Sequence, residues 1–383
     1  MSHGELAHLW RTANDRIRER RIDMRVQNKE RLQYLDMAKG IGIILVVIGH
    51  STYAGESLLT WIASFHMPLF FIISGMLLRH TGEEEKKMSI IIKKKLKSIM
   101  LPYLSFSVIY LLMDAAMLML HAGSKTFIDF FYSMIATFTL YGISTLWFLP
   151  ALLIGEIFFL YIRKHCNHMG TIIIGLVLAA IVGITHPIFD ANYALYNAIY
   201  YLIPGYLIIC LYRSATAYVF ITFGYYIKNY LTQKDTPQIK EIALAAALFA
   251  LGGAAAFANG RVDLNAVIFK NNLYFYIGAC AGTMAVVLLC KNIKTWKPLL
   301  KLGRNSLIIM ATHLDFRVMI TAIRGASLIS ERVAFLQPYL QWLLVAVLVT
   351  SMEYIIIYIW NRYFYFLIGK KKPVSRKNFK VIK

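Results

Sequence analysis

Two polar side chains occur on one apolar stretch near the N-terminus, YLDMAKGIGIILVVIGH. Lys39 and His50 are eleven residues apart, which in an α-helix is three turns plus about 20°, so both side chains share one face. They would be separated by about 16 Å along the helix axis. Because polar groups inside membrane helices are costly, they are functional candidates. The pair predicts a line along which an elongated molecule with an anionic head could lie.

Two further histidines lie in apolar stretches. His66, in SFHMPLFFIISG, should sit at about the depth of His50 on the next helix, and His313, in GRNSLIIMATH, in the middle of a later one. A neutral imidazole can act as a general base or as a nucleophile at pH 7. Three histidines in one half of a helical bundle favour such chemistry over core filling. No acidic or cysteine ligand with suitable spacing accompanies them, so the sequence predicts no metal.

Each polar residue also has a structural interpretation, which the sequence leaves open. Lys39 alone is typical of a lysine that extends its ammonium to the membrane surface and fixes the topology. Asp36, one turn earlier, either orients Lys39 or caps the helix. Arg213 is a candidate for binding an anionic substrate, although a structural role is favoured. Ser74 and Gly75 predict a close helix contact. Three carboxyl groups inside apolar stretches are expected to make hydrogen bonds between helices: Asp114, Glu156 and Glu353.

The composition indicates the fold class. Hydrophobic residues make up 58% of the 383-residue chain and charged residues 16%, with a mean hydropathy of +0.56. This composition excludes a disordered chain and indicates an all-α, polytopic helical membrane protein. The four cysteines have no disulfide or ligand spacing. The net charge of +21 comes from basic residues beside apolar stretches, which indicates membrane topology rather than nucleic-acid binding. Binding of anionic lipid or of a phosphorylated cosubstrate by some of these residues stays open.

A membrane-spanning helix needs about 20 mostly apolar residues. Placing the basic loops in the cytoplasm predicts ten such helices, with both termini on that side. The stretch 196–230 contains proline, glycine and arginine and should cross once, at about 213–230, which leaves 190–212 as an outer amphipathic or re-entrant segment. The aromatic segment 124–144 should lie at the same surface. The other nine spans are predicted near 37–54, 61–79, 99–121, 145–162, 171–189, 241–258, 271–290, 305–323 and 339–367.

The chain divides into three parts by composition. Residues 1–33 form a basic arm that lacks the features of a signal peptide, 34–368 form the transmembrane domain, and 369–383 form a basic tail. The arm and the tail are expected in the cytoplasm, and the protein in a cell inner or plasma membrane. With no soluble domain predicted, any chemistry would take place within the transmembrane domain.

These motifs resemble the acyltransferase-3 family of integral-membrane acyltransferases, over about residues 31–320. The first helix of that family carries Arg or Lys, ten residues, and then His. Here this spacing falls on Lys39 and His50, and the family's preceding Asp falls on Asp36. The other matching positions are Phe70, Phe71, Ser74, Gly75, Lys94, Lys97, Pro102, Tyr103, Trp147, Asn305, Ser306, Leu307 and His313.

The resemblance implies an O-acyltransferase that moves an acetyl, or sometimes another acyl group, from cytoplasmic acyl-CoA to a hydroxyl of a surface or lipid-linked glycan. His50 would act as general base or accept the acyl group, and His66 or His313 would assist it. The candidates for binding acyl-CoA at the inner end are Asp36, Lys39, Lys94 and Lys97. The candidates for binding the acceptor are Trp147, Arg213, Asn305 and Ser306.

The chain departs from the family in the basic cluster before the third helix, where lysines replace the common arginines, and at the fourth helix. Many glycan-modifying members carry Trp-Ser-Leu-x-x-Glu at the fourth helix, where this chain has WFLPAL, with Leu152 in place of the Glu. The chain resembles instead the branch that includes fucose-acetylase-like and enterobacterial-antigen-type acetyltransferases. The residues also allow a second function, that of a transporter or flippase for a lipid-linked sugar whose histidines relay protons. Turnover of acyl-CoA separates the two functions.

Overall fold

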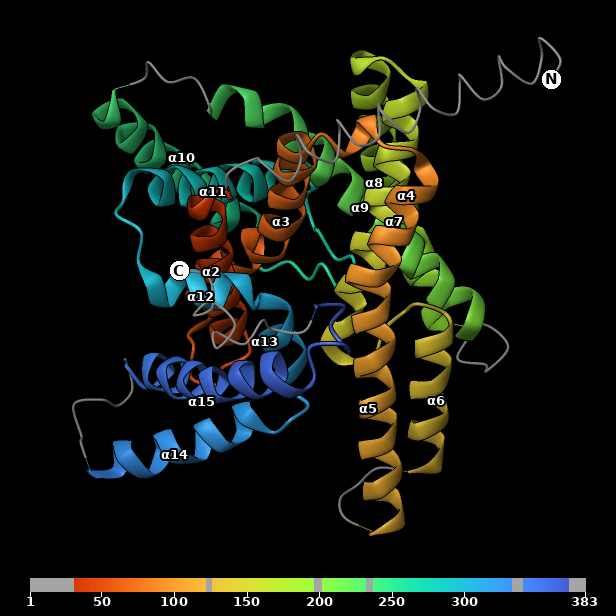
Figure 1. The fold of residues 1–383 in the computed structure, drawn as a ribbon, viewed down its shortest axis with the longest axis vertical. Coiled ribbons are helices and arrows are strands. Elements are labelled where there is room, and N and C mark those ends of the chain that lie inside the picture. The colour runs from red at the N-terminus through yellow and green to blue at the C-terminus, as the bar shows by residue number, and fades with distance from the viewer. Residues whose placement is uncertain (1–30, 122–125, 196–201, 232–236, 333–339, 372–383) are drawn as a thin grey trace, which may run out of the picture.

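The computed structural model describes residues 31–121, 126–195, 202–231, 237–332 and 340–371. These residues are almost entirely helical (Figure 1), which confirms the all-α class. A single antiparallel bridge, between Asp263 and Ile268, is the one β-type contact in this part of the chain. Most of the predicted N-terminal arm and C-terminal tail, residues 1–30 and 372–383, lies outside the described residues.

Helix α2 (Gln33–Gly49) lies at the centre of the bundle. It packs against α3 (Glu56–Thr81), α11 (Asn272–Asn292), α12 (Lys297–Arg304) and α15 (Gln341–Tyr363). Ten of its 17 residues are buried. A helix that is apolar almost all round is expected to be enclosed by others, as α2 is.

Helices α4 to α8 lie together on one side of this centre (Figure 1). α5 lies alongside α6, and α14 lies alongside α15 (Figure 1). A π-helical turn, Leu96–Met100, joins α4 to α5. The other elements are η1 (Glu83–Glu85), α4 (Met88–Lys95), α5 (Leu101–Met119), α6 (Phe127–Phe138), η3 (Ser144–Trp147), α7 (Phe148–His165), α8 (His168–Leu195), α9 (Leu202–Leu231), α10 (Gln238–Asn259), α13 (Ser306–Thr312) and α14 (Val318–Arg332).

Eight helical segments within the described residues are long and apolar enough to cross a membrane. They correspond to eight of the ten predicted spans. The first predicted span, 37–54, is α2, which begins earlier than predicted and ends just before His50.

The prediction of a continuous helix over 305–323 is wrong. The chain forms α13, turns after His313 and continues as α14. Unsatisfied carbonyls at a helix end are costly in a membrane. Here the hydroxyl of Tyr110 donates to the carbonyl of Ala311, and that of Thr145 donates to the carbonyl of Met310 at 2.7 Å. These two side chains make the break possible.

The predicted boundary at residue 213 is also wrong. α9 begins at Leu202 and runs unbroken for 30 residues, and α8 continues to Leu195, so 190–212 is not a separate element. Pro204 lies in the first turn of α9, where its missing N–H removes no helical hydrogen bond. The side chains of 191–201 lie outside the described residues. The predicted aromatic segment 124–144 contains the short helix α6.

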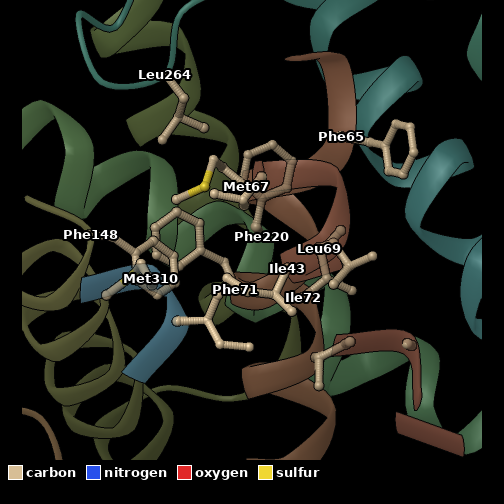
Figure 2. Packing of buried hydrophobic residues seen from close by; sticks show 14 of the residues in the cluster. Ile43, Phe65, Met67, Leu69, Phe71, Ile72, Phe148, Phe220, Leu264 and Met310 are labelled. Carbon is tan, nitrogen blue, oxygen red and sulfur yellow. The ribbon is translucent and has the colours of Figure 1, made fainter. Parts of the chain in front are cut away.

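The predicted close contact at Gly75 is confirmed. A methyl group at Gly75 would overlap the carbonyl oxygen of Ile221 on α9, and one at Gly224 would overlap that of Ile72 on α3. These glycines let the two backbones touch, as small residues do at membrane helix interfaces. Figure 2 shows the apolar core beside this contact, in which the rings of Phe71 and Phe148 stack with centroids 4.7 Å apart.

Candidate active site

Three helices bring their histidines to one end of α2. α2 ends next to His50, α3 carries His66 in its third turn, and α13 ends next to His313. His50 and His66 line a cavity of about 370 Å³. The ring of His313 is fully buried and packs against that of His50, with 5.2 Å between the centroids. The structure thus gathers the three histidines that the sequence singled out.

The hydrogen bonds of two histidines define which ring nitrogen carries the proton. Nδ1 of His66 lies 2.8 Å from the carbonyl oxygen of Ile62, and Nδ1 of His313 lies 2.8 Å from that of Ile309. A carbonyl oxygen can only accept, so each Nδ1 donates and each Nε2 of the neutral ring is an acceptor. Nε2 of His313 is buried and has no hydrogen-bond partner among the described residues. An acceptor atom is therefore available beside His50.

The lining of the cavity includes an aromatic side chain and several polar residues among apolar ones. Trp147, from η3, is among the lining residues, and its contact with an acceptor stays a prediction. The loop between α10 and α11 contributes Arg261, Asp263 and Asn265. An aromatic face next to hydrogen-bonding groups is the kind of surface that a sugar ring contacts. Sequence reasoning missed this loop because it lies between two spans and carries no motif.

Arg213 lies behind the cavity rather than in it. Its guanidinium donates to the backbone oxygen and the side-chain oxygen of Asn265, both at 2.7 Å, and to the carbonyl of Tyr141 at 2.7 Å. It also lies over the rings of Tyr141 and Trp147, 4.3 and 5.2 Å from their centroids. All three guanidinium nitrogens are thus bonded to protein. Arg213 holds Trp147 and Asn265 in place, a positioning role.

The opposite end of α2 carries a cluster of positive charge around Asp36. The buried carboxylate of Asp36 accepts from Arg31 at 2.5 Å, from Lys39 at 2.9 Å and from Arg304 at 3.2 Å. Three cations thus face one anion, an excess of two positive charges. Because Lys39 is about one fifth exposed, its ammonium remains accessible from outside the bundle.

A fourth cation and two amides adjoin this cluster. Lys370 donates to Asn305 at 3.1 Å and to Asn361 at 2.7 Å. Burial, and then the charge of Arg31, lower the pKa of Lys370. Asn305 follows Arg304 directly, so it lies at the Asp36 end of α2. Asn305, and Ser306 next to it, were predicted to contact the acceptor together with Trp147, but the structure places them at the other end. We name Arg31, Lys39, Arg304 and Lys370 the inner cation cluster, after the side of the membrane that the sequence predicts for this end of α2.

The comparison with protein families matches this whole architecture. The sequence model of the acyltransferase-3 family, described as an acyltransferase domain, matches residues 32–369. The chain belongs to the acyltransferase-3 family. No curated protein and no solved structure matches it significantly. Membership establishes a membrane acyltransferase in general terms. The matched residues include those that line the histidine cavity and, from the inner cation cluster, Lys39 and Arg304.

Within this acyltransferase-3 fold, a second polar network links three helices. The carboxylate of Glu156 on α7 accepts a hydrogen bond from Ser74 on α3 and pairs with Lys95 at 2.8 Å. Lys95 also pairs with Glu83 at 3.1 Å. Glu156 lies one helical turn after Leu152, the position where many family members carry glutamate. The hydrogen bond from Ser74 and the ion pair with Lys95 confirm the expected role of Glu156 as an interhelical hydrogen-bonding group.

The two lysines of the family motif, Lys94 and Lys97, lie in different surroundings. Lys94 forms an ion pair with Glu83, whereas Lys97 is exposed at the start of the π turn. A methyl group at Gly369 would overlap the carbonyl oxygen of Lys97, so Lys97 adjoins Lys370. Burial alone would raise the pKa of Glu83, but the ammonium groups of Lys95 and Lys94 outweigh it and hold that pKa below its usual range.

Several polar residues of the site carried no signal that the sequence analysis used. Arg304 and Lys370 come from predicted basic loops, Asn361 from within the last predicted span, and Lys95 was one lysine among several. The positive-inside rule places such residues at a membrane surface but not against one another. Within the described residues, no group of three His, Cys, Asp or Glu side chains has the geometry to hold a metal ion.

Proposed function

We propose that this protein transfers an acyl group, most simply acetyl from acetyl-CoA, to a hydroxyl of a cell-surface or lipid-linked glycan. The main observation in support of this proposal is that one helix, α2, has a cation cluster at one end and three histidines at the other. Acyl-CoA has the matching shape, with phosphates at one end and a thioester at the other. The family membership supports the acyltransferase function over that of a transporter.

The inner cation cluster would bind the phosphates of CoA. Arginine forms bidentate contacts with phosphate and lysine acts as a point charge, and both kinds of cation are present. Lys97 joins this proposed set because it is exposed and adjoins Lys370. Lys94 is less suited, since its ammonium already neutralises Glu83. Asp36 would hold Arg31, Lys39 and Arg304 close together when no donor is bound.

His50 would carry the chemistry. A hydrogen bond from one ring nitrogen of His50 to Nε2 of His313 would leave the other nitrogen free to act as a base. That nitrogen would take the proton of the acceptor hydroxyl as its oxygen attacks the thioester carbonyl. The carbon–sulfur bond then breaks, and the CoA thiolate takes the proton from His50. In an alternative order, the free nitrogen of His50 attacks the thioester carbonyl, the carbon–sulfur bond breaks, and the CoA thiolate takes the remaining ring proton to leave an acyl-imidazole. The acceptor hydroxyl then attacks that acyl group, and its proton returns to His50 as the carbon–nitrogen bond breaks.

The acceptor would occupy the cavity of about 370 Å³ next to His50. Trp147 offers a ring face for stacking, and Asp263 and Asn265 offer hydrogen-bonding atoms. His66 also lines this cavity, and its Nε2 would accept from a sugar hydroxyl. This arrangement favours an acceptor with several hydroxyl groups over an apolar one.

The test supplies membrane vesicles with acetyl-CoA labelled in the acetyl group. We expect release of free CoA together with transfer of label to the glycan or glycolipid fraction. A transporter without chemistry would release no CoA. Label recovered in another fraction, such as amino acids, would keep the acyltransferase and overturn the glycan acceptor.

A further inference from the structure

The end of α13 is held by polar contacts from three directions. Thr145 of η3 and Tyr110 of α5 donate to the carbonyls of Met310 and Ala311. The third contact comes from α15, where both carboxyl oxygens of Glu353 lie 2.9 Å from the hydroxyl oxygen of Thr312. Thr312 directly precedes His313, so this last contact is the one nearest to the histidine.

If Glu353 were ionised, the single hydroxyl hydrogen of Thr312 could not satisfy both of the acceptors that lie next to it. The hydroxyl of Thr312 carries one hydrogen, and its oxygen also lies 2.8 Å from the carbonyl oxygen of Ile308. A carboxylate and a carbonyl would both need that hydrogen. If Glu353 is protonated, it donates to Thr312, and Thr312 donates to Ile308, so that every contact is satisfied.

The surroundings of Glu353 are those of a neutral group. Glu353 and Thr312 are both fully buried. No ion pair within the described part of the chain includes Glu353. This distinguishes it from Glu156 and Glu83, which share Lys95. A buried carboxylate without a cation is strongly disfavoured, whereas a buried carboxylic acid that donates a hydrogen bond is not.

We propose that Glu353 is a protonated positioning residue, a neutral carboxylic acid on α15 that donates to Thr312 and thereby fixes His313 against His50. The proposal rests on the proposed function in one respect, the role of His313 as the partner of His50. α13 has seven residues and ends inside the bundle, so its own helical hydrogen bonds do little to fix its last turn. A displacement of a reacting group by 1 Å can cost about 100-fold in rate.

The first test is independent of activity. We expect the infrared spectrum of the purified protein at neutral pH to contain the C=O band of a protonated carboxyl group that is absent from Glu353→Gln. A difference spectrum that shows a carboxylate band instead would overturn the proposal.

The second test separates hydrogen bonding from charge. Glu353→Gln keeps a neutral donor and should retain turnover with acetyl-CoA in membrane vesicles. Glu353→Leu removes the donor, leaves the bond from Thr312 to Ile308 intact, and should lower kcat about tenfold or more with little change in KM. Ser351→Ala is the matched control, since its hydroxyl bonds, among the described residues, only to the carbonyl of Val347 on the same helix. Turnover near wild type in Glu353→Leu, or a loss in Glu353→Gln as large as that in Glu353→Leu, would contradict the proposal.

Failure of this proposal can be told apart from failure of the proposed function. If wild-type vesicles release no CoA from acetyl-CoA, the proposed function fails, while the infrared band still decides the protonation of Glu353. If the wild type and Glu353→Leu release CoA at equal rates, the proposed function stands and Glu353 has no positioning role.

Discussion

The ring of His50, at the end of α2, lies 5.2 Å from the ring of His313, at the end of α13. The two residues are 263 positions apart, and each lies at the end of a helix. Nδ1 of His313 is committed to the carbonyl of Ile309, which leaves Nε2 as the only acceptor on that ring. The contact thus pairs a histidine on the cavity with a buried one that can orient it.

The inner cation cluster predicts a binding defect. We expect Lys39→Ala to raise KM for acetyl-CoA about tenfold or more, with little change in kcat, because a charged hydrogen bond contributes about 1.5–3 kcal/mol. Initial rates of CoA release over a range of acetyl-CoA concentrations measure this. Lys294, an exposed lysine after α11, provides the matched control. An unchanged KM in Lys39→Ala would indicate that Lys39 only fixes the topology.

The close contact between α2 and α12 predicts a stability defect. A methyl group at Gly303 would overlap the carbonyl oxygen of Asp36. Gly303→Ala should therefore push α12 away and lower the thermal unfolding temperature. Gly253→Ala is the control, because a methyl group there meets no atom within 4 Å and a helical Gly→Ala change contributes up to about 1 kcal/mol. Equal unfolding temperatures for the two variants would refute the close contact.

The pKa of Glu83, which is held below its usual range, predicts a pH dependence of stability. A carboxyl whose pKa is lower in the folded state stabilises the fold above its unfolded pKa of about 4.3 and loses that contribution as pH falls through the folded pKa. The difference in stability between wild type and Glu83→Gln should thus be largest at neutral pH and decrease at acidic pH. Thermal unfolding from pH 7 down to pH 4 and below measures it. A difference that is constant with pH would show that the ion pairs with Lys94 and Lys95 add no stability.

The features that could be predicted from the sequence are those governed by local periodicity. The eleven-residue spacing of Lys39 and His50 places them on one helix face wherever α2 lies, and long apolar runs predict most helices. The proximity of His313 to His50 depends on a break in a helix that the apolar pattern does not mark. Its cause is the pair of hydroxyl groups of Tyr110 and Thr145, which come from distant segments.

Two other features of the structure could not be predicted, because they depend on contacts with residues whose positions in space the sequence does not give. Arg213 lies within an unbroken α9 because Asn265 and Tyr141, both outside that helix, satisfy its guanidinium. Whether Lys94 or Lys95 is the buried lysine depends on which face α4 turns toward the bundle. A π-helical turn connects α4 to α5. Neither the turn nor the positions of Glu83 and Glu156 can be obtained from spacing alone.

The most direct test of the account is mass spectrometry of the host's surface glycans with the wild-type gene, with His50→Ala and with His165→Ala. His165 is the control, because it is exposed and its Nδ1 bonds to the carbonyl of Tyr161, as His66 bonds to that of Ile62. We expect an ester-linked acyl mass with wild type and His165→Ala, reduced at least about 100-fold with His50→Ala at equal protein level in the membrane. An unchanged glycan profile with His50→Ala would contradict the central claim that His50 carries the transfer.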